Sequence, residues 1–490
     1  MLSRERRLRE DRFMAADGAA LAYRHWPAAA ACDRALILFP CGDEPTAQVL
    51  ADKFGFAEAH VFTWDARAAG DFMAHVRDAE RFVRHVEAEH GFAPANMAAI
   101  GSGLGASIAG VWAHDFAPPL RALALMEPRL RTRRRASANT PAGFRAAIRR
   151  LTDDTAALPM PLFLFTAGAH TSSAAREEAL GAARQLLSAE FTKPTGPRSL
   201  GDADYRGPWR EEFDRNAAPL PWFSPLRWSY AAYGLLMRSV GRLSRGISLG
   251  LAAGFDSGPM FDYVYRNRAE GITPLGRKID RDFLNKPPWR AIHARRRHLE
   301  AMLAEAIAAL RAAGTPIHVI EIGAGGARYT LEVLRKHAPE ASALLLDRDA
   351  ASVAAARKLA AELGMGNVAS EEGDGFDRAA LARLAPRPTI AIVSGLYEQR
   401  AENAPLRESL AGLAAAVPAG GFLLYTNQPW NPHLAFIARM LTTADGQRWV
   451  MRRRSQAEMD QLVAEAGFAK RAMAIDDDGI ATVSLAQRRP

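Results

Sequence analysis

The sequence predicts an α/β fold class with two domains in succession, and three observations support this. Short apolar runs alternate with segments of helical periodicity in two separate blocks, which is typical of sheets covered by helices. The chain has 490 residues, roughly three times the usual size of one domain. Between the blocks, residues 191–225 are rich in proline, glycine and charge, which indicates a domain junction.

The first block extends from Arg34 to about Thr166. Five apolar runs in it have the length and composition of buried parallel strands, and residues 71–90 between them have a helical period. The predicted strands are Ala35–Phe39, His60–Trp64, Met97–Gly101, Ala122–Met126 and Leu162–Thr166.

The second block begins near Arg296 with a long helical pattern that continues to Ala313. Strand-like runs separated by helical segments follow, which again predicts an α/β sheet. These runs are Ile317–Gly323, Ala343–Asp347, Thr389–Gly395, Gly421–Thr426 and Ala481–Ala486.

A connector joins the two blocks. After the helix-breaking segment 219–225 (PLPWFSP), residues 226–251 predict one helix with an apolar stripe and a separate basic stripe. The apolar stripe contains Tyr233, Leu236, Met237, Val240, Ile247 and Leu251, and the basic stripe contains Arg238, Arg242 and Arg245. Packing of the apolar stripe on a neighbouring domain is the favoured interpretation, and contact with an anionic membrane is the alternative. We therefore expect domains at 1–215, 216–295 and 296–490.

Composition excludes several classes of protein. Hydrophobic residues make up 49% and charged residues 24%, the ordinary globular balance. The sequence has no run of eighteen apolar residues, so no membrane-spanning helix is predicted. The charged N-terminus (MLSRERRLREDRF) has no signal-peptide core. With only Cys32 and Cys41, a disulfide framework or a cysteine-rich zinc site is excluded. We expect a cytoplasmic protein without a metal site, with peripheral membrane contact left open.

The positive charge of the chain is clustered. Lys and Arg number 63 against 54 Asp and Glu, a net charge of +9. The clusters are Arg129–Arg135, Arg295–Arg297 and Arg452–Arg454. A solvated face is the favoured interpretation, with anionic lipid or acidic ligands as the alternative. No nucleic-acid motif accompanies the clusters, so no nucleic acid is expected.

A glycine-rich turn is the sharpest chemical signal. The segment Glu321-Ile-Gly323-Ala-Gly325-Gly326-Ala327 lies between a predicted strand and a helix. Glycines at such a turn let the backbone approach a ligand closely. Glu321 would repel a pyrophosphate, whereas it suits a cation such as an ammonium or a sulfonium. The turn therefore predicts a site for a cationic ligand.

Acids after the next two strands extend this site. Asp347 ends the second strand, where a carboxylate can accept hydrogen bonds from ribose hydroxyls, and Asp349 is the fallback. In Gly373-Asp374-Gly375-Phe376, Asp374 could take an adenine amino group while Phe376 lines its face. Each acid alone could be a cap or turn residue. Their combination predicts a nucleoside site.

This set resembles the class I S-adenosylmethionine-dependent methyltransferases, which have a Rossmann-like sheet. The resemblance implies S-adenosyl-L-methionine as cofactor, with Gly323 and Gly325 along its methionine part. It implies that Asp347 holds the ribose, Asp374 the adenine, and that Glu321 supports the loop. Ala327 stands where the common pattern has a third glycine.

Four further strings resemble one bacterial group in which a methyltransferase domain follows an α/β-hydrolase-like domain. The strings are Gly254–Gly258, Asp262–Arg268, Thr426–Leu434 and Trp449–Phe468. The resemblance implies that residues 254–268 form a lid or N-terminal extension over the cofactor.

The acceptor pocket is expected at the carboxyl ends of the fourth and fifth strands of the second block. Residues 394–398 and 427–430 would line it, with Ser394 also at the cofactor. Tyr397 or Glu398 could take a proton from a hydroxyl or amine acceptor; for Tyr397 and Trp430 packing is the alternative. The acceptor, a small or lipid-like molecule, is not identified by the sequence.

The first block resembles the α/β-hydrolase fold but lacks its catalytic residues. The strings 17–27 and 64–70 resemble the opening hairpin and a turn of that fold, and residues 100–107 stand where its nucleophile elbow belongs. The elbow pattern is G-x-S-x-G, yet here Gly103 occupies the central place between Gly101 and Gly105, and Ser102 lies one residue early.

The other two members of a hydrolase triad are also absent. His170 follows the predicted strand that should precede the acid, and residues 187–216 contain no histidine. Cys41 is interpreted as a structural thiol rather than a nucleophile. We therefore expect a pseudo-hydrolase domain that serves binding or assembly. Two alternatives are a bifunctional hydrolase and methyltransferase that uses Ser102 or Cys41, and a non-enzymatic adaptor at a membrane surface.

Overall fold

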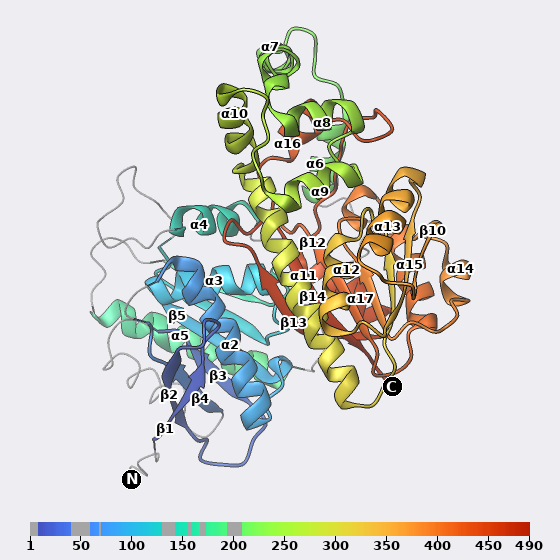
Figure 1. Cartoon of the computed structure of the whole chain (residues 1–490). Helices are drawn as coiled ribbons and strands as arrows, with labels where there is room; N and C mark the ends of the chain where they lie inside the picture. Colours follow the sequence, from blue (N-terminus) through green and yellow to red (C-terminus); the bar gives the residue numbers. More distant parts are fainter. Residues whose placement is uncertain are drawn as a thin grey trace, which may run out of the picture. The chain divides into compact units, whose positions relative to one another are not determined.

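The computed structural model describes residues 8–40, 59–67, 70–129, 143–154, 158–166, 173–193 and 208–490. The chain divides after Leu200 into two compact units, each built on a seven-stranded sheet (Figure 1). This division differs from the expected domains. Helix α6 (Pro208–Ala217) belongs to the second unit, and the boundary expected at residue 296 falls inside α11 (Pro287–Ala312). The connector is thus part of the second unit.

The sheet of the first unit has the order β1-β2-β4-β3-β5-β6-β7. A hairpin of the first two strands joins the sheet through β2, which is antiparallel to β4, and the strands from β3 to β7 are parallel to one another. All five predicted strands are confirmed to within one residue. The strands are β1 (Arg9–Met14), β2 (Ala20–Trp26), β3 (Ala35–Leu38), β4 (His60–Trp64), β5 (Met97–Ser102), β6 (Ala122–Met126) and β7 (Leu162–Phe165).

Helices cover both faces of this sheet. On one face α2 (Phe72–His90), α3 (Leu104–Phe116) and α4 (Phe144–Asp153) pack together. On the other, α5 (Ser173–Thr192) buries Ala183 and Leu187 against alternate side chains of the parallel strands. The short helix η1 (Pro94–Asn96) precedes β5. Alternate burial on two faces explains why these strands are continuous apolar runs.

The sheet of the second unit has the order β10-β9-β8-β11-β12-β14-β13. The strands from β8 to β12 are parallel, and β14 is antiparallel to both of its neighbours. The strand order reverses between β8 and β11, which is the point where open α/β sheets bind ligands. The strands are β8 (His318–Ile322), β9 (Ser342–Asp347), β10 (Val368–Glu372), β11 (Ile390–Val393), β12 (Phe422–Asn427), β13 (Phe468–Ile475) and β14 (Thr482–Arg488).

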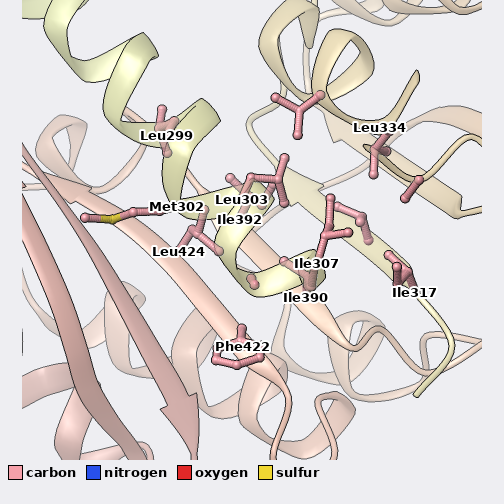
Figure 2. Packing of buried hydrophobic residues seen from close by; sticks show 14 of the residues in the cluster. Leu299, Met302, Leu303, Ile307, Ile317, Leu334, Ile390, Ile392, Phe422 and Leu424 are labelled. Carbon is pink, nitrogen blue, oxygen red and sulfur yellow. The ribbon is translucent and has the colours of Figure 1, made fainter. Parts of the chain in front are cut away.

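The long helix α11 anchors one face of this sheet. Figure 2 shows Leu299, Leu303 and Ile307 of α11 beside side chains of β11 and β12, in a cluster that includes Ile390, Ile392 and Leu424. The helix begins at Pro287, nine residues before the expected start at Arg296, because proline is favoured at the first helical position. Other helices around the sheet are α12 (Arg328–His337), α13 (Ala350–Glu362), α14 (Arg378–Ala382), α15 (Ala404–Ala416) and α17 (Gln456–Glu465), with η4 (Tyr397–Gln399) after β11.

A group of short helices lies beyond the carboxyl ends of the strands of the second sheet (Figure 1). It comprises α6, α7 (Pro225–Arg238), η3 (Val240–Leu243), α8 (Arg245–Ala253), α9 (Gly258–Arg266), α10 (Pro274–Leu284) and α16 (Leu434–Met440). The prediction of one helix over residues 226–251 is wrong. The chain leaves the α-helix at Ser239, and the Ser244 hydroxyl caps a new helix by accepting from the Ile247 amide at 3.1 Å.

The break divides the predicted apolar stripe. Met237 and Ile247 are buried, but Tyr233, Leu236 and Val240 remain exposed. Within the second unit, only part of the stripe is therefore buried. Within the described part of the chain, no helix combines the length and apolar character that crossing a bilayer requires.

Candidate functional site

A cavity of about 540 Å³ lies where the parallel strands of the second sheet end, at the reversal of strand order. Its lining includes the turn after β8, the ends of β9 and β10, and the residues that follow β11. All seven residues assigned to the cofactor from the sequence line it: Glu321, Gly323, Gly325, Asp347, Asp374, Phe376 and Ser394. Its volume is in the range of ordinary small-molecule sites.

The glycine turn has the backbone that its sequence requires. Gly323 and Gly325 have φ values of 65° and 53°, a region that favours glycine. A Cβ atom at Gly323 would also lie 3.2 Å from a Leu396 methyl group. Ala327 has φ 48° and precedes α12, so this alanine occupies a left-handed position where glycine would be less strained.

Asp347 both faces the cavity and holds the turn in place. One of its oxygens accepts from the Gly325 amide at 2.8 Å, and the other from the Asp349 amide at 2.9 Å. Asp349, the fallback candidate, also lines the cavity and caps α13 through the Ser352 amide at 3.0 Å. Asp374 accepts from the Phe376 amide at 3.0 Å. Each carboxylate thus fixes its own loop.

Glu321 is buried beneath the turn. Its two carboxylate oxygens accept from the Tyr329 hydroxyl and from Thr330 Oγ1, the latter at 2.6 Å. Burial raises the pKa of Glu321 to about 7, against the opposing effect of these hydrogen bonds. The carboxyl group therefore joins β8 to the first turn of α12 and changes its charge near neutral pH.

The roof of the cavity comes from residues that the strand-end argument does not identify. Asp256, Ser257, Phe261 and Tyr265, in and just before α9, line the cavity together with residues 443–445. Asp256 accepts from the Ala444 amide at 2.7 Å, and burial raises the pKa of Asp256. The segment 254–268 thus lies at the cavity, where the resemblance places a lid or extension.

The charge of the lining is strongly unequal. Seven carboxyl groups line the cavity, against three arginines, Arg295, Arg328 and Arg348. The carboxyl groups belong to Asp256, Asp262, Glu321, Asp347, Asp349, Asp374 and Asp445. Opposite charges attract more strongly inside a protein than in bulk water, because the effective dielectric constant is lower. This lining favours a positively charged ligand over a pyrophosphate.

A second cavity of about 290 Å³ adjoins the first. Aromatic and aliphatic side chains dominate its lining. Many come from α7, α11 and α16, Trp289 of α11 among them, and Trp449 comes from the segment after α16. Phe261, Arg295 and Gly395 line both cavities. The acceptor pocket was expected here, at the ends of β11 and β12. Gln428, Asn431 and His433 line it, whereas Trp430 packs against Ala291, Ile480 and Ala481.

The two residues expected to exchange a proton with the acceptor line neither of these cavities. Tyr397 is 2% exposed, lies in the core beside α15, and donates to Ser409 Oγ at 2.9 Å. Burial raises its pKa. Glu398 is also buried, and burial raises its pKa. The assignment of Tyr397 and Glu398 as catalytic residues is therefore corrected, because η4 turns both side chains into the protein.

Two of the basic clusters are not solvated faces. Arg454 is 1% exposed and donates to the backbone carbonyls of Tyr397, Arg400 and Glu402, while Arg452 pairs with Glu458 at 2.8 Å. In the other cluster, Arg295 is buried, Arg296 pairs with Glu300 at 2.6 Å, and Arg297 is exposed. Arg295 is thus a buried residue that lines both cavities, which the sequence cluster does not reveal.

The first unit contains a sharp turn where the hydrolase elbow was expected. Gly103, between β5 and α3, has φ 57° and ψ −116°, a strained backbone conformation. As a glycine, it has no side chain at this position. Ser102 is the last residue of β5. Cys41, His170 and residues 130–135 of the first arginine cluster lie outside the described residues. Within the described residues, no group of three or more His, Cys, Asp or Glu side chains could hold a metal ion.

The second unit is therefore an α/β domain with a glycine turn and an acidic cavity at its switch point. The chain belongs to the family described as "Putative methyltransferase", whose model matches residues 183–488, more than half of its length. A curated relative, "Uncharacterized protein YnbC" of Escherichia coli K12, is 32% identical over an alignment of 573 residues. That alignment covers 97% of this chain and 98% of the relative.

Solved structures overlap with parts of the chain. A "possible exported protein" of Bordetella parapertussis is 19% identical, with a TM-score of 0.42, and the match covers 58% of this chain and 93% of that one. An O-methyltransferase family protein of Burkholderia thailandensis is 19% identical, with a TM-score of 0.32, covering 43% and 62%. Membership of a methyltransferase family rests on the family model.

Proposed function

We propose that the second unit binds S-adenosyl-L-methionine and transfers its methyl group to an acceptor in the adjoining apolar cavity. The observation that carries this proposal is the cavity at the switch point, with seven carboxyl groups around a glycine turn. Membership of the methyltransferase family supports the same reaction. A positively charged sulfonium with a neighbouring ammonium group matches that lining in charge.

The residues present fit this cofactor. The backbone of Gly323 and Gly325 would lie along its methionine part, because neither residue has a side chain to occupy the space. Asp347 would hold the ribose hydroxyls, and Asp374 the adenine amino group. Phe376 would lie against the adenine ring. Arg400 stacks on the Phe376 ring, with its guanidinium carbon 4.4 Å from the ring centre.

When bound, the cofactor supplies an activated methyl group on a positively charged sulfur. The protein contributes position more than acid or base chemistry. Phe261, Arg295 and Gly395 form a wall common to both cavities, so a methyl donor and an acceptor held on either side lie next to each other. Holding two reactants in line can supply on the order of 7–11 kcal/mol. The apolar side chains of the second cavity also exclude water from the reaction.

We further propose that the first unit is an α/β-hydrolase-like domain without hydrolase activity. Its strand order and the strained turn at Gly103 support the fold, and the missing side chain at Gly103 argues against the chemistry. Loss of a nucleophile typically reduces turnover by roughly a millionfold. This unit would then serve ligand binding or assembly.

Titration calorimetry with the full chain tests the cofactor assignment. S-adenosylmethionine and its demethylated product should bind, whereas NAD⁺, which carries a pyrophosphate, should not. If neither S-adenosylmethionine nor its demethylated product binds, the proposal is contradicted. For the first unit, a panel of short-chain esters should remain unhydrolysed by wild type, Ser102→Ala and Cys41→Ala alike. Hydrolysis that either substitution abolishes would instead establish a bifunctional enzyme.

A further inference from the structure

The two adjoining cavities differ in charge as well as in size. Carboxyl groups dominate the first, whereas none of the residues that line the second is acidic. The second cavity does have cationic side chains, Lys286 and Arg295. His433 also lines it, and burial lowers the pKa of this histidine, which leaves it neutral at neutral pH. The second cavity is therefore apolar with a positive rather than a negative character.

Arg295 is the cation that lies between the cavities. It is 4% exposed. The charge of the buried Glu398 carboxyl group acts on it, but the structure gives no ion pair or hydrogen bond between the two side chains. Its guanidinium lies 5.7 Å from the Phe261 ring centre, and Nη2 donates to the Tyr265 hydroxyl at 3.4 Å. Its Nε atom has no partner. A buried guanidinium with so few hydrogen-bond acceptors is costly to maintain, and a ligand oxygen at the common wall would supply an acceptor.

The backbone next to Arg295 is shaped to admit its side chain. A Cβ atom at Gly395 would lie 3.0 Å from Arg295 Nη1, and Gly395 has φ 70°. Glycine at this position therefore leaves room for the guanidinium at the wall common to both cavities. The remaining N–H groups of an arginine can hold a carboxylate or a phenolate in a fixed orientation.

We propose that the acceptor is an apolar oxyanion, a carboxylate or phenolate on a hydrophobic body, whose charged oxygen Arg295 holds at the common wall. This inference rests on the proposed methyl transfer. The acceptor oxygen attacks the methyl carbon, so a C–O bond forms while the S–C bond breaks. The bonding electron pair stays on sulfur, which becomes a neutral thioether, and the acceptor becomes a neutral methyl ester or ether.

This acceptor class explains why no proton-accepting residue is needed. An oxygen that is already ionised carries no proton to remove, so the burial of Tyr397 and Glu398 away from the cavities is no obstacle to the reaction. The cationic sulfonium and the anionic acceptor neutralise each other as the methyl group moves. Arg295 is a binding residue in this scheme rather than an acid or a base.

Equilibrium binding of matched probes tests the inference. The probes are 2-naphthoate and its neutral amide, which share one apolar body, measured through the fluorescence of the cavity tryptophans with the demethylated cofactor product present. Wild type should bind the anion roughly tenfold or more tightly than the amide. Arg295→Gln should remove that preference and Arg295→Lys should keep part of it. Arg297→Gln, an exposed arginine on the same helix, should behave as wild type.

The outcomes separate this inference from the methyltransferase proposal. The inference is overturned, and the proposed function is not, if wild type binds S-adenosylmethionine but shows no preference for the anion. The same holds if Arg295→Gln retains the preference. Binding of S-adenosylmethionine to Arg295→Gln should be at least as tight as to wild type, since a positive charge has been removed from the lining; this also shows that the variant is folded. Failure of wild type to bind S-adenosylmethionine overturns the proposed function instead.

An independent inference concerns the exposed face of α7 and the segment before it. Trp222 is 74% exposed and Leu235 71% exposed, unusual values for large apolar side chains in a group. The other exposed members are Phe223, Leu226, Trp228, Tyr233, Leu236 and Val240. Within the second unit, α7 lies at the end of the helical group farthest from the sheet (Figure 1).

The charge of this face selects the partner. Arg227, Arg238, Arg242 and Arg245 are exposed here, and the sequence from Pro219 to Ala253 contains no Asp or Glu. A face that combines tryptophan and leucine with arginine is typical of helices that lie in the surface of an anionic bilayer. A second copy of the chain fits less well, because a symmetric contact would bring the arginines of both copies together without acids to pair with.

From this face we infer that α7 and residues 219–224 dock the protein on an anionic lipid bilayer. Sedimentation of the full chain with vesicles tests it, using phosphatidylcholine alone or with about one third phosphatidylglycerol. Wild type should bind the mixed vesicles, and added salt should weaken binding. Trp222→Ser with Trp228→Ser should lower binding roughly tenfold or more. Arg238→Gln with Arg242→Gln should reduce the preference for phosphatidylglycerol.

A control separates this face from apolar exposure elsewhere. Leu186 on α5 is 40% exposed in the first unit, and Leu186→Ser should leave vesicle binding unchanged. The inference is overturned if wild type binds neither kind of vesicle or if the tryptophan variant binds as wild type does. It is also overturned if the wild-type chain forms a dimer that the tryptophan substitutions dissociate, because a second copy is then the occupant.

Discussion

The two units contain the same kind of turn with opposite chemistry. In each, a strand inside the sheet leads through glycines into a helix, at Gly101–Gly105 in the first unit and at Gly323–Gly326 in the second. Packing requires the glycines of the first turn: a Cβ at Gly105 would lie 2.3 Å from the Pro40 carbonyl oxygen. The apex of that turn, Gly103, has no side chain, whereas Glu321 and Asp347 support the second turn. Glycines thus specify the turn, and neighbouring side chains decide whether it binds a ligand.

The sharpest test of this contrast removes the acid that holds the second turn. Asp347→Ala should weaken S-adenosylmethionine binding by roughly a hundredfold or more, because charge-assisted hydrogen bonds to the ligand and to the Gly325 amide are lost together. Calorimetry measures the change. Asp377→Ala is the matched control, since Asp377 caps α14 through the Ala379 amide at 2.9 Å and does not line the cavity. Unchanged affinity in Asp347→Ala would contradict the site.

The second test uses the ionisation of Glu321. Its pKa of about 7 means that the carboxyl group is neutral below that pH and negative above it. Affinity for a cationic cofactor should therefore rise several-fold between roughly pH 6 and pH 8. The folded protein binds this proton more tightly than the unfolded chain, so the contribution to stability is present below about pH 4.5 and is lost as the pH rises through 7. In Glu321→Gln the affinity should lose this pH dependence; a profile as steep as that of wild type would exclude Glu321 as its source.

The third test addresses the first unit. Burial lowers the pKa of His75, His85 and His90. Their contribution to stability is present above the unfolded value of about 6.5 and is lost as the pH falls through the lower folded values. The unfolding free energy of this unit should decrease on mild acidification, by less than about 1 kcal/mol per residue because the rings retain solvent contact.

Denaturant titrations of wild type and His85→Gln at several pH values measure this effect. The variant should show a weaker dependence on acid than wild type. His114 acts in the opposite direction, since Asp115 and Asp154 raise its pKa against the effect of burial. Equal pH dependence of wild type and His85→Gln would show that His85 does not contribute.

The smallest effect is expected where the second turn departs from glycine. Ala327→Gly relieves a left-handed alanine but loses a buried methyl group and adds freedom to the unfolded chain. The unfolding free energy should change by less than about 1 kcal/mol. Ala324→Gly, at a position without positive φ, should cost more. Greater destabilisation by Ala327→Gly than by Ala324→Gly would show that methyl packing outweighs backbone strain.

The strands, and the gathering of the seven candidate cofactor residues at one cavity, were predictable because each depends on a local signal. Buried parallel strands are continuous apolar runs, and a carboxylate after such a strand must lie at one edge of the sheet. The connector was less predictable. Apolar spacing over residues 226–251 indicates one helix, but the backbone at Ser239 (φ −101°, ψ −94°) ends it, and periodicity does not report such a break.

Burial of charged residues was not predictable from sequence, because the partners come from distant segments. Arg454 is surrounded by carbonyl groups of residues 397–402, and Arg295 lies at a wall formed with Phe261 and Gly395. Neither set is adjacent in the chain. The register of η4 likewise decides that Tyr397 faces Ser409 rather than a cavity. Of the roof, the resemblance placed residues 254–268 over the cofactor, whereas residues 443–445, in the segment between β12 and β13, were not predicted.

The roof also has a consequence for the synthesis of the chain. Asp256 accepts from the Ala444 amide, and a Cβ at Gly254 would lie 2.3 Å from that nitrogen. The ribosome therefore synthesises one side of the roof before the first strand of the second sheet and the other side after β12. The cavity is complete only when both have left the ribosome. A nascent chain that ends before residue 440 would thus lack one side of the roof over the proposed cofactor.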